Sequence, residues 1–438
     1  MQSGAAKKDR SVSTLTPAQR ALAVFPGGSL GESSTPADLL VVLARGEGAT
    51  VWDTNGQPRP DFTMGWGSVI LGHAHPAVTE AVQRQAPRGA NFSHVNEQAI
   101  ELAEELVGAL PCAEQVRFCA SGGEATGYAV AVARAFMRRQ KILKFEGAFH
   151  GSHDIGTLSL YPRQLLNFPQ AEAMSDATTP RGAEDVLIAP YNDSAATEEI
   201  LQRYKNEIAA IIVEPLHRCI SPLPGFLPSL RKMATEAGVL LIFDETVTGF
   251  RLAYGGAQEY YGVQPDLLAT GKAVGGGYPI GFVAGRAEIM QLFDEHRFGN
   301  PQYAYFASTT GGNPVSMAAA LATLKELRKP GTFENLFSLG EALRQGLREV
   351  FSEEGITAQI QGDGPIAGVA FTEHEITDYR TFFRSDRVRR RTFMLGLFSR
   401  GIFLNPNSSK FYLSCSHKTK DIDRLLDVAR ETLRSDLR

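Results

Sequence analysis

An apolar run, Leu240 to Phe243, ends in two acidic residues, Asp244 and Glu245. In an open α/β sheet, ligands bind at the carboxyl ends of the strands. An acid that is partly desolvated there needs a cation or a hydrogen-bond donor as its partner. A protonated ring nitrogen of a bound ligand would be such a partner, whereas a helix cap or an internal ion pair is the alternative. Asp244 is therefore a candidate ligand-binding acid.

A lysine stands beside a glycine cluster farther along the chain. Lys272 follows Ala269-Thr270-Gly271 and precedes Ala273-Val274-Gly275-Gly276-Gly277. Confinement lowers the pKa of a lysine, and the neutral amine then attacks carbonyl groups. The glycines allow the backbone to approach closely. An ordinary surface lysine is the alternative for Lys272 alone.

Two further motifs follow strand-like runs. Gly122 and Gly123 directly precede a helical pattern, so their N–H groups and the helix dipole could hold a phosphate, although a plain helix cap is the alternative. Phe149 lies in Gly147-Ala148-Phe149-His150-Gly151, where an aromatic ring could stack on a flat ligand. Core packing is the alternative for Phe149.

Together and in this order, these motifs resemble those of the class III (fold-type I) pyridoxal-phosphate (PLP) aminotransferases. The resemblance runs from about Pro26 to Leu433, and the nearest branch is that of the glutamate-1-semialdehyde 2,1-aminomutases. Its strongest stretches are Arg45–Ala49, Ile70–Pro76 and Asp244–Gly277. The resemblance implies an α/β fold: a large domain with a mainly parallel sheet flanked by helices, plus a smaller α+β domain. It also implies PLP as the cofactor and small amine and keto compounds as substrates.

Carried over residue by residue, the resemblance implies a role for each cofactor motif. Lys272 would hold PLP covalently and then move protons. Asp244 would pair with the ring nitrogen and keep the ring an electron sink. Gly122 and Gly123 would bind the phosphate, and Phe149 would stack on one face of the ring.

The resemblance implies four further positions. Thr246 would pack on the other face of the ring, and Glu214 would be an acid near the site. Thr309 would reach the phosphate of the neighbouring subunit, which implies a homodimer with shared active sites. Trp66 lies in a segment that lines the substrate pocket in the family, and core packing is its alternative.

Three departures from the aminomutase pattern surround the substrate. An arginine that grips the substrate carboxylate is missing after Pro26-Gly27-Gly28, where Glu32 follows instead. The loop after Glu214 is shorter and carries His217, and Lys410 ends a segment that bears an acid in the aminomutases. Arg218, Arg251 or Lys410 could replace the missing cation. We therefore expect the substrate residues to include Glu32, Trp66, His217 and Lys410.

These departures predict an aminotransferase whose substrate is not glutamate-1-semialdehyde and either lacks a carboxylate at that position or carries an amine that Glu32 could meet. An intramolecular 2,1-aminomutase is the alternative. A nucleotide-binding α/β protein is a third hypothesis, but the chain lacks a GxGxxG motif after its first strand and a Walker lysine.

The elements that position these residues alternate along the chain. Thr16-Pro17 predicts a helix that runs to about Val24, and Asn55-Gly56 predicts a β-hairpin. Alternating helices and short apolar strands then predict an α/β core. The expected helices span residues 75–85, 96–110 and 124–138, and the expected strands span 115–118, 141–145, 209–213 and 239–243.

The length of 438 residues predicts more than one lobe. We expect a flexible tail over residues 1–15, an N-terminal segment over 16–70 that joins the small domain, a large PLP-binding domain over 71–320, and a C-terminal small domain over 321–438. A basic run from Arg387 to Arg391 is expected to be a solvated helix face.

Composition excludes several classes of partner. The chain has 44 Lys and Arg against 48 Asp and Glu, so a net charge of −4 gives no reason to expect nucleic acid or membrane partners. Four cysteines without CxxC spacing predict neither disulfides nor a metal site. With no signal-like apolar run near the N-terminus, a cytoplasmic location is expected.

Overall fold

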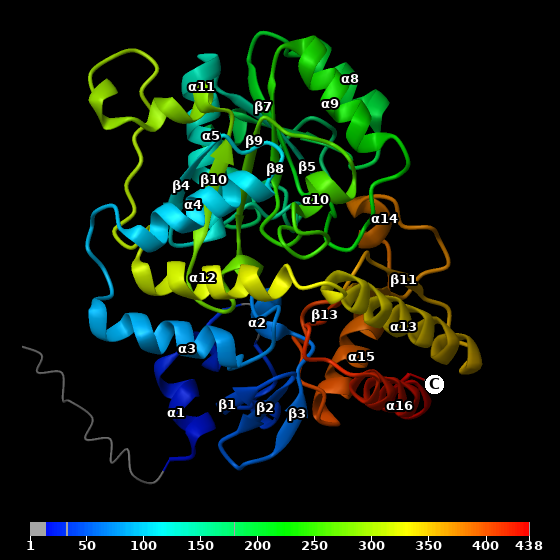
Figure 1. Ribbon diagram of the computed structural model, residues 1–438. Helices are drawn as coiled ribbons and strands as arrows, with labels where there is room; N and C mark the ends of the chain where they lie inside the picture. The colour runs from blue at the N-terminus through cyan, green and yellow to red at the C-terminus, as the bar shows by residue number, and fades with distance from the viewer. Residues whose placement is uncertain (1–14, 32–33, 179, 438) are drawn as a thin grey trace, which may run out of the picture.

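A seven-stranded sheet forms the centre of the larger part of the molecule (Figure 1). The computed structural model describes residues 15–31, 34–178 and 180–437. The strand order is β4-β10-β9-β8-β7-β5-β6, and only β10 is antiparallel to its neighbours. The strands are β4 (Gln115–Cys119), β5 (Lys141–Phe145), β6 (Val186–Ala189), β7 (Ile208–Val213), β8 (Leu240–Asp244), β9 (Leu267–Gly271) and β10 (Gly281–Gly285).

The central strands are continuous apolar runs because helices cover both faces of the sheet. In β8, Leu241 and Phe243 face one apolar core, whereas Leu240 and Ile242 face another core on the side of α5. The predicted α/β fold with a mainly parallel sheet is therefore confirmed. The helices of this part are α3 (Pro76–Gln85), α4 (Glu97–Ala109), α5 (Gly122–Met137), α6 (Asp154–Thr157), α7 (Pro180–Glu184), α8 (Ser194–Arg203), α9 (Phe226–Ala237), α10 (Gly256–Tyr260), α11 (Ala287–Met290) and α12 (Pro314–Leu327), with short 3-10 turns η4 (Ala86–Arg88), η5 (Lys272–Gly275), η6 (Gln291–Phe293) and η7 (Glu295–Arg297).

A second apolar core lies in the C-terminal part, beside a three-stranded antiparallel sheet. Its elements are α13 (Thr332–Glu353), β11 (Gln359–Gln361), β12 (Ile366–Ala370), α14 (Tyr379–Phe383), α15 (Arg387–Ser399), β13 (Lys410–Tyr412) and α16 (Thr419–Asp436). Phe62 of the N-terminal segment is buried in this core, and its carbonyl accepts the N–H of Tyr412 at 2.8 Å. The domain limits at residues 70 and 320 stay predictions.

The N-terminal segment adds a three-stranded sheet of its own. It contains α1 (Pro17–Val24), η2 (Pro26–Gly28), η3 (Ala37–Leu39), β1 (Leu43–Glu47), β2 (Thr50–Asp53), β3 (Pro58–Pro60) and a left-handed turn labelled α2 (Met64–Gly67). Thr16 caps α1 as predicted, and β2 and β3 form the predicted hairpin.

Two sequence predictions need correction or completion. The basic run opens α15 with Arg387 and Arg391 exposed, but the Nη1 atom of Arg390 is buried, so the prediction of a solvated face is wrong for that residue. Sequence analysis also missed β6, β9 and β10, because β9 and β10 are short and rich in glycine and alanine. Among the described residues, no helix is long and apolar enough to cross a membrane.

Glycines let the start of α5 lie directly against the sheet. A Cβ on Gly281 would overlap the carbonyl oxygen of Ser121, and one on Gly271 would lie 3.4 Å from the backbone nitrogen of Gly122. These positions bring the end of β9, where Lys272 follows, beside the N-terminus of α5.

Replacing Gly281 with alanine is therefore expected to force β10 away from α5 and to lower the free energy of unfolding by roughly 1–3 kcal/mol. Gly108→Ala is the matched control, because Gly108 lies within α4 with no atom near its Cβ position. That control is expected to stabilise the protein by about 0.5–1 kcal/mol. Urea unfolding measures both, and equal effects of the two variants would contradict the close-approach argument.

Candidate active site

The carboxyl edge of the large sheet gathers the residues that the motifs indicated. Asp244 is the last residue of β8, Lys272 follows β9, and Glu214 follows β7. These three strands are adjacent and parallel, so their carboxyl ends meet at one edge. The N-terminus of α5 lies against the same edge through Gly122.

Asp244 is a buried carboxylate with partners on both oxygens. Its Oδ2 accepts a hydrogen bond from Nδ1 of the buried His150 at 2.8 Å. Its Oδ1 accepts the backbone N–H of Thr246 at 3.0 Å and the Thr246 hydroxyl at 2.5 Å. Glu245 points elsewhere and accepts the N–H groups at the start of α10. The contact with His150 holds the Asp244 carboxylate in one orientation.

Sequence reasoning missed His150 as a site residue. His150 follows Phe149 directly in the sequence, so its position in the same motif could have indicated a role at the site. Its contact with Asp244 joins segments 94 residues apart.

Lys272 has a left-handed backbone conformation, and the pKa of its amine is lowered. Its φ of 49° lies in the left-handed region, which costs energy for a residue with a Cβ and is found at functional sites. Burial, the charge of Lys410 and that of Arg251 lower its pKa to about 8, against the attraction of Asp244 and Glu214. Among the described residues, its ammonium makes no hydrogen bond or salt bridge.

The start of α5 offers exposed N–H groups beside Asp244. Ser121 caps the helix by accepting the N–H of Glu124 at 3.2 Å, which leaves the amides of Gly122 and Gly123 without helical partners. A Cβ on Gly122 would lie 2.6 Å from Cγ2 of Thr246. Thr246 therefore lies between the helix terminus and Asp244.

The loop that carries Phe149 is held by a buried lysine. The Nζ of Lys144 donates to the carbonyls of Ala148, Ile155, Gly156 and Leu158 at 2.7 to 3.2 Å. Burial lowers the pKa of Lys144 to about 7. Phe149 is 44% exposed although Ala148 and His150 on either side are buried. An aromatic ring held open in a braced loop suits a stacking surface.

Glu214 and His217 form a buried pair. His217 Nδ1 lies 3.2 Å from Glu214 Oε2, and the imidazole packs on the ring of Tyr191. Burial lowers the pKa of His217, and although burial opposes charge on Glu214, His217 and Lys410 lower its pKa to about 2. His217 is fully buried beside Glu214, and its contact with the substrate stays a prediction.

The three cations that could replace the missing arginine differ in their hydrogen-bond partners. Arg218 donates to the carbonyls of Gly147 and Leu160 at 2.8 and 2.9 Å. Arg251 is fully buried and donates to the carbonyls of Gly67, Val247 and Leu413. Lys410 makes no side-chain hydrogen bond or salt bridge among the described residues. Lys410 is therefore the available cation of the three.

Three more predicted residues complete the comparison with the sequence. Trp66 is half-buried in the left-handed turn whose carbonyl at Gly67 is held by Arg251. Thr309 is exposed, and its backbone carbonyl accepts a hydrogen bond from the side chain of Asn91 at 3.0 Å. Glu32 lies outside the described residues.

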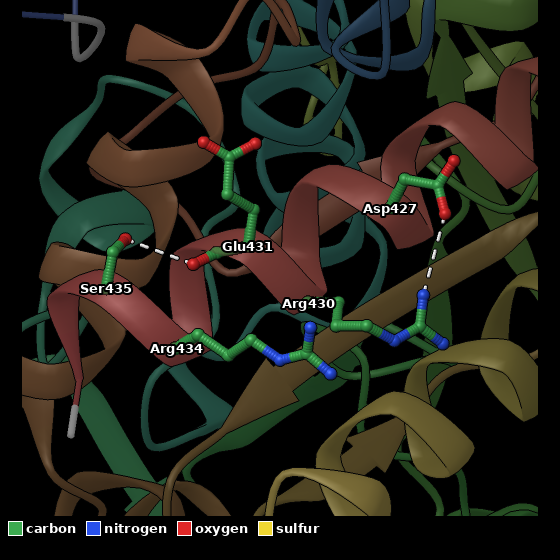
Figure 2. Close-up of a pocket in the computed structure, with 5 residues that line it drawn as sticks. All are labelled: Asp427, Arg430, Glu431, Arg434 and Ser435. Carbon is green, nitrogen blue, oxygen red and sulfur yellow. Dashed lines mark hydrogen bonds and ion pairs between the residues drawn. The ribbon is translucent and has the colours of Figure 1, made fainter.

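A well-formed surface hollow elsewhere is not a competing site. It lies on α16 and is lined by Asp427, Arg430, Glu431, Arg434 and Ser435 (Figure 2). Its arginines pair with Glu353 and Glu354 at 2.9 and 2.8 Å, and no aromatic or apolar wall is present. It lacks the apolar lining that a binding pocket for an organic ligand uses.

Comparison with known proteins identifies the family of the chain. Residues 33–411 match the family aminotransferase class-III. The chain belongs to the class III aminotransferases. It is 40% identical over 399 residues to the glutamate-1-semialdehyde 2,1-aminomutase of Desulforudis audaxviator, which covers 90% of each chain.

Solved structures of class III aminotransferases agree with the fold. An omega-transaminase from Sphaerobacter thermophilus has a TM-score of 0.89 at 35% identity, covering 95% of this chain and 96% of that one. A transaminase with PLP bound has a TM-score of 0.86 at 28% identity, with the same coverage. The class III aminotransferases are PLP-dependent enzymes, which confirms the predicted family and cofactor.

The residues at the carboxyl edge fit PLP. The carboxylate of Asp244, oriented by His150, suits a protonated ring nitrogen. The amine of Lys272 has a lowered pKa and no partner among the described residues, which suits covalent attachment. The open N–H groups at the start of α5 suit a phosphate. Phe149 and Thr246 would then hold the ring from its two faces.

With Lys272 as the proposed attachment point for PLP, its pKa is expected to set the pH at which the apoenzyme takes up the cofactor. Only the neutral amine attacks the PLP aldehyde, so attachment is slow below the pKa and fast above it. The rate of PLP attachment to the apoenzyme is expected to rise to a plateau with a midpoint near pH 8. Stopped-flow absorbance of the attached cofactor measures it, and Lys272→Ala, which should show no attachment, is the control. A midpoint near the ordinary lysine pKa of 10.5 would contradict the confinement of Lys272.

Proposed function

We propose that this class III aminotransferase moves the amino group of an amino acid, and that Lys410 binds the substrate carboxylate. The observation that carries the proposal is the free cation of Lys410 beside Lys272. The charge of Lys410 lowers the pKa of both Lys272 and Glu214, so its ammonium lies close to both side chains. Backbone carbonyls engage Nε and Nη2 of Arg218, which leaves only Nη1, and they engage all three nitrogens of Arg251.

The local fold supports this position for Lys410. Lys410 opens β13 opposite Gly368 of β12, and a Cβ on Gly368 would lie 2.9 Å from Sγ of Cys219. The start of β13 therefore lies beside the segment that follows Glu214. Burial opposes the charge of Lys410, but neighbouring groups that include Tyr412 and Glu214 raise its pKa above the ordinary value. A protonated Lys410 supports a carboxylate in the substrate, contrary to the expectation from the missing arginine.

Each residue of the site has a defined task in this proposal. The cofactor supplies an electron sink for the carbon that carries the amino group. Asp244, oriented by His150, holds the proton on the ring nitrogen. Lys272 Nζ moves the proton between the carbon atoms, and its pKa of about 8 suits both uptake and release near neutral pH. Phe149 and Thr246 exclude water from the two faces of the ring.

The amino group can move within one molecule or between two molecules. We propose the intramolecular reaction first, because the curated relatives at about 40% identity are named glutamate-1-semialdehyde 2,1-aminomutases. The comparisons thus favour the alternative of the sequence analysis over its main prediction. Transfer to a separate keto acid is the second candidate. Two observations favour it: the segment 405–410, which stands where the aminomutases have a segment that bears an acid, and the similarity to an omega-transaminase.

One experiment separates the two reactions. Purified holoenzyme is given glutamate-1-semialdehyde with and without an added keto acid, and the 5-aminolevulinate formed is measured. Efficient conversion without a keto acid supports the aminomutase. Conversion of an amino acid only when a keto acid is consumed supports the transferase. Failure of a broad panel of amino acids in both formats would refute the proposed activity.

Replacing Lys410 tests the carboxylate contact. Lys410→Met is expected to raise KM for the amino acid about tenfold or more, because a lost charge-assisted hydrogen bond to a carboxylate costs about 1.5–3 kcal/mol. Lys410→Arg keeps the charge and should retain most of the affinity. The methionine variant should also raise the pH midpoint for PLP attachment, since the charge of Lys410 lowers the pKa of Lys272. An unchanged KM in Lys410→Met would contradict the role.

We further propose a homodimer whose active sites are shared through Thr309. Thr309 is exposed, so its side chain is open to a phosphate in a second copy. Sedimentation of the active holoenzyme should give a dimer, and Thr309→Ala should weaken PLP retention. A fully active monomer would refute the shared site.

A further inference from the structure

Three arginines gather where α14 and α15 meet the loop of the large sheet. Arg218 lies 4.7 Å from the ring of Tyr161 and 5.0 Å from that of Tyr379. The Tyr379 ring is 6.0 Å from Phe383, which in turn carries the guanidinium of Arg387 at 5.6 Å. Arg390, one turn farther along α15, lies over Phe382 at 4.9 Å. Aromatic rings of α14 thus separate and support the three cations.

Among the described residues, no carboxylate forms a salt bridge with any of the three arginines. Glu146 is a buried acid of the same region, but both of its oxygens are taken by Arg380 at 2.7 and 3.0 Å. Other arginines of α15 have partners: Arg389 donates to the carbonyl of Leu437 and Arg391 to the side chain of Asn407. Within α15, Arg387 and Arg390 are therefore the described arginines whose side chains have neither a hydrogen bond nor a salt bridge.

Arg390 is the most constrained member of the cluster. Its Nη1 atom is buried and has no hydrogen-bond partner. Burial, together with the like charges of Arg387 and Arg218, lowers the pKa of Arg390. Gathering like charges around a buried donor that has no partner is unfavourable unless an anion compensates them.

We propose that Arg218, Arg387 and Arg390 form a binding site for an oxyanion, either a phosphate or a carboxylate. Guanidinium groups bind both anions through paired N–H donors, and the free Nη1 of Arg390 supplies one such donor. Tyr161, which is 45% exposed beside Arg218, closes the rim of the site. This site is separate from the phosphate position at the start of α5.

The site is linked to the cofactor loop. Arg218 holds the carbonyls of Gly147 and Leu160, which lie on either side of the Phe149 loop. Two sources of the anion follow from this position. It is either a distal acidic group of the substrate, which would rest on the proposed function, or a free anion that binds on its own.

Inorganic phosphate tests the site in the PLP-loaded holoenzyme. Calorimetric titration at low ionic strength, with PLP absorbance followed to verify that the cofactor stays bound, gives the phosphate Kd. The wild type should bind phosphate with saturation. Arg390→Met, which keeps the apolar stem, and Arg387→Gln, at an exposed position, should each raise the Kd roughly tenfold. Arg424→Gln removes the same charge from an exposed face of α16 and should leave the Kd unchanged.

Thermal unfolding provides a readout that does not depend on activity. Without phosphate, Arg390→Met should unfold at a higher temperature than the wild type, because it removes an uncompensated buried charge. With phosphate, the wild type should gain stability and the variant should not. Absence of phosphate binding, or equal binding by Arg390→Met and Arg424→Gln, would overturn the proposal even if the amino-transfer activity were established.

Kinetics then distinguish the two sources of the anion. If the site holds a distal acidic group, phosphate should compete with a dicarboxylic amino acid, and Arg390→Met should raise KM for it but not for a monocarboxylic one. If the anion binds on its own, phosphate should leave both KM values unchanged while it still binds. Each result supports the oxyanion site, and neither depends on which amino-transfer reaction the enzyme performs.

Discussion

The carboxyl edge of the large sheet holds acidic and basic side chains that are largely shielded from water. The site depends on the electrostatic attraction between these opposite charges. Asp244 and Glu214 are acids at the ends of neighbouring strands, and Lys272 and Lys410 are the cations beside them. The shift of the Lys272 pKa from 10.5 to about 8 corresponds to ~3 kcal/mol that disfavours its protonation. A lysine that is readily neutral is the form required for bonding to a carbonyl group.

The surrounding structure keeps these charges in place through backbone groups. His150 orients Asp244, and the loop that carries His150 is held by the four carbonyl contacts of Lys144. Lys144 is a cation that orders a loop rather than one that pairs with an acid. Arg251 acts similarly: it donates to the carbonyl of Gly67 in the left-handed turn at Trp66 and to the carbonyls of Val247 and Leu413. These buried cations fix loop geometry because backbone carbonyls can accept their hydrogen bonds without adding a charge.

The arginines near the site differ in whether backbone carbonyls accept their hydrogen bonds. Arg218 is taken up by backbone carbonyls yet shares its surroundings with Arg387 and Arg390, which have no such acceptors among the described residues. Lys410 likewise has no acceptor. Cations left without partners mark the places where an anionic ligand would lower the free energy of the protein. One such place lies beside Lys272, and the other lies behind the loop that carries Phe149.

The sequence by itself determined the features that reside in local segments. The strand that ends in Asp244, the glycines beside Lys272, the cap of α1 and the hairpin at Gly56 are each decided by a few neighbouring residues. Tertiary structure alone decided the pairing of His150 with Asp244 and the burial of His217 and of the Arg390 Nη1 atom. It also decided that backbone carbonyls bind Arg218 and Arg251 but leave Lys410 without a partner among the described residues. Those outcomes depend on contacts between segments far apart in the chain. A residue type states which charges or hydrogen bonds a side chain can form, but only the fold determines which partners reach it and whether water does.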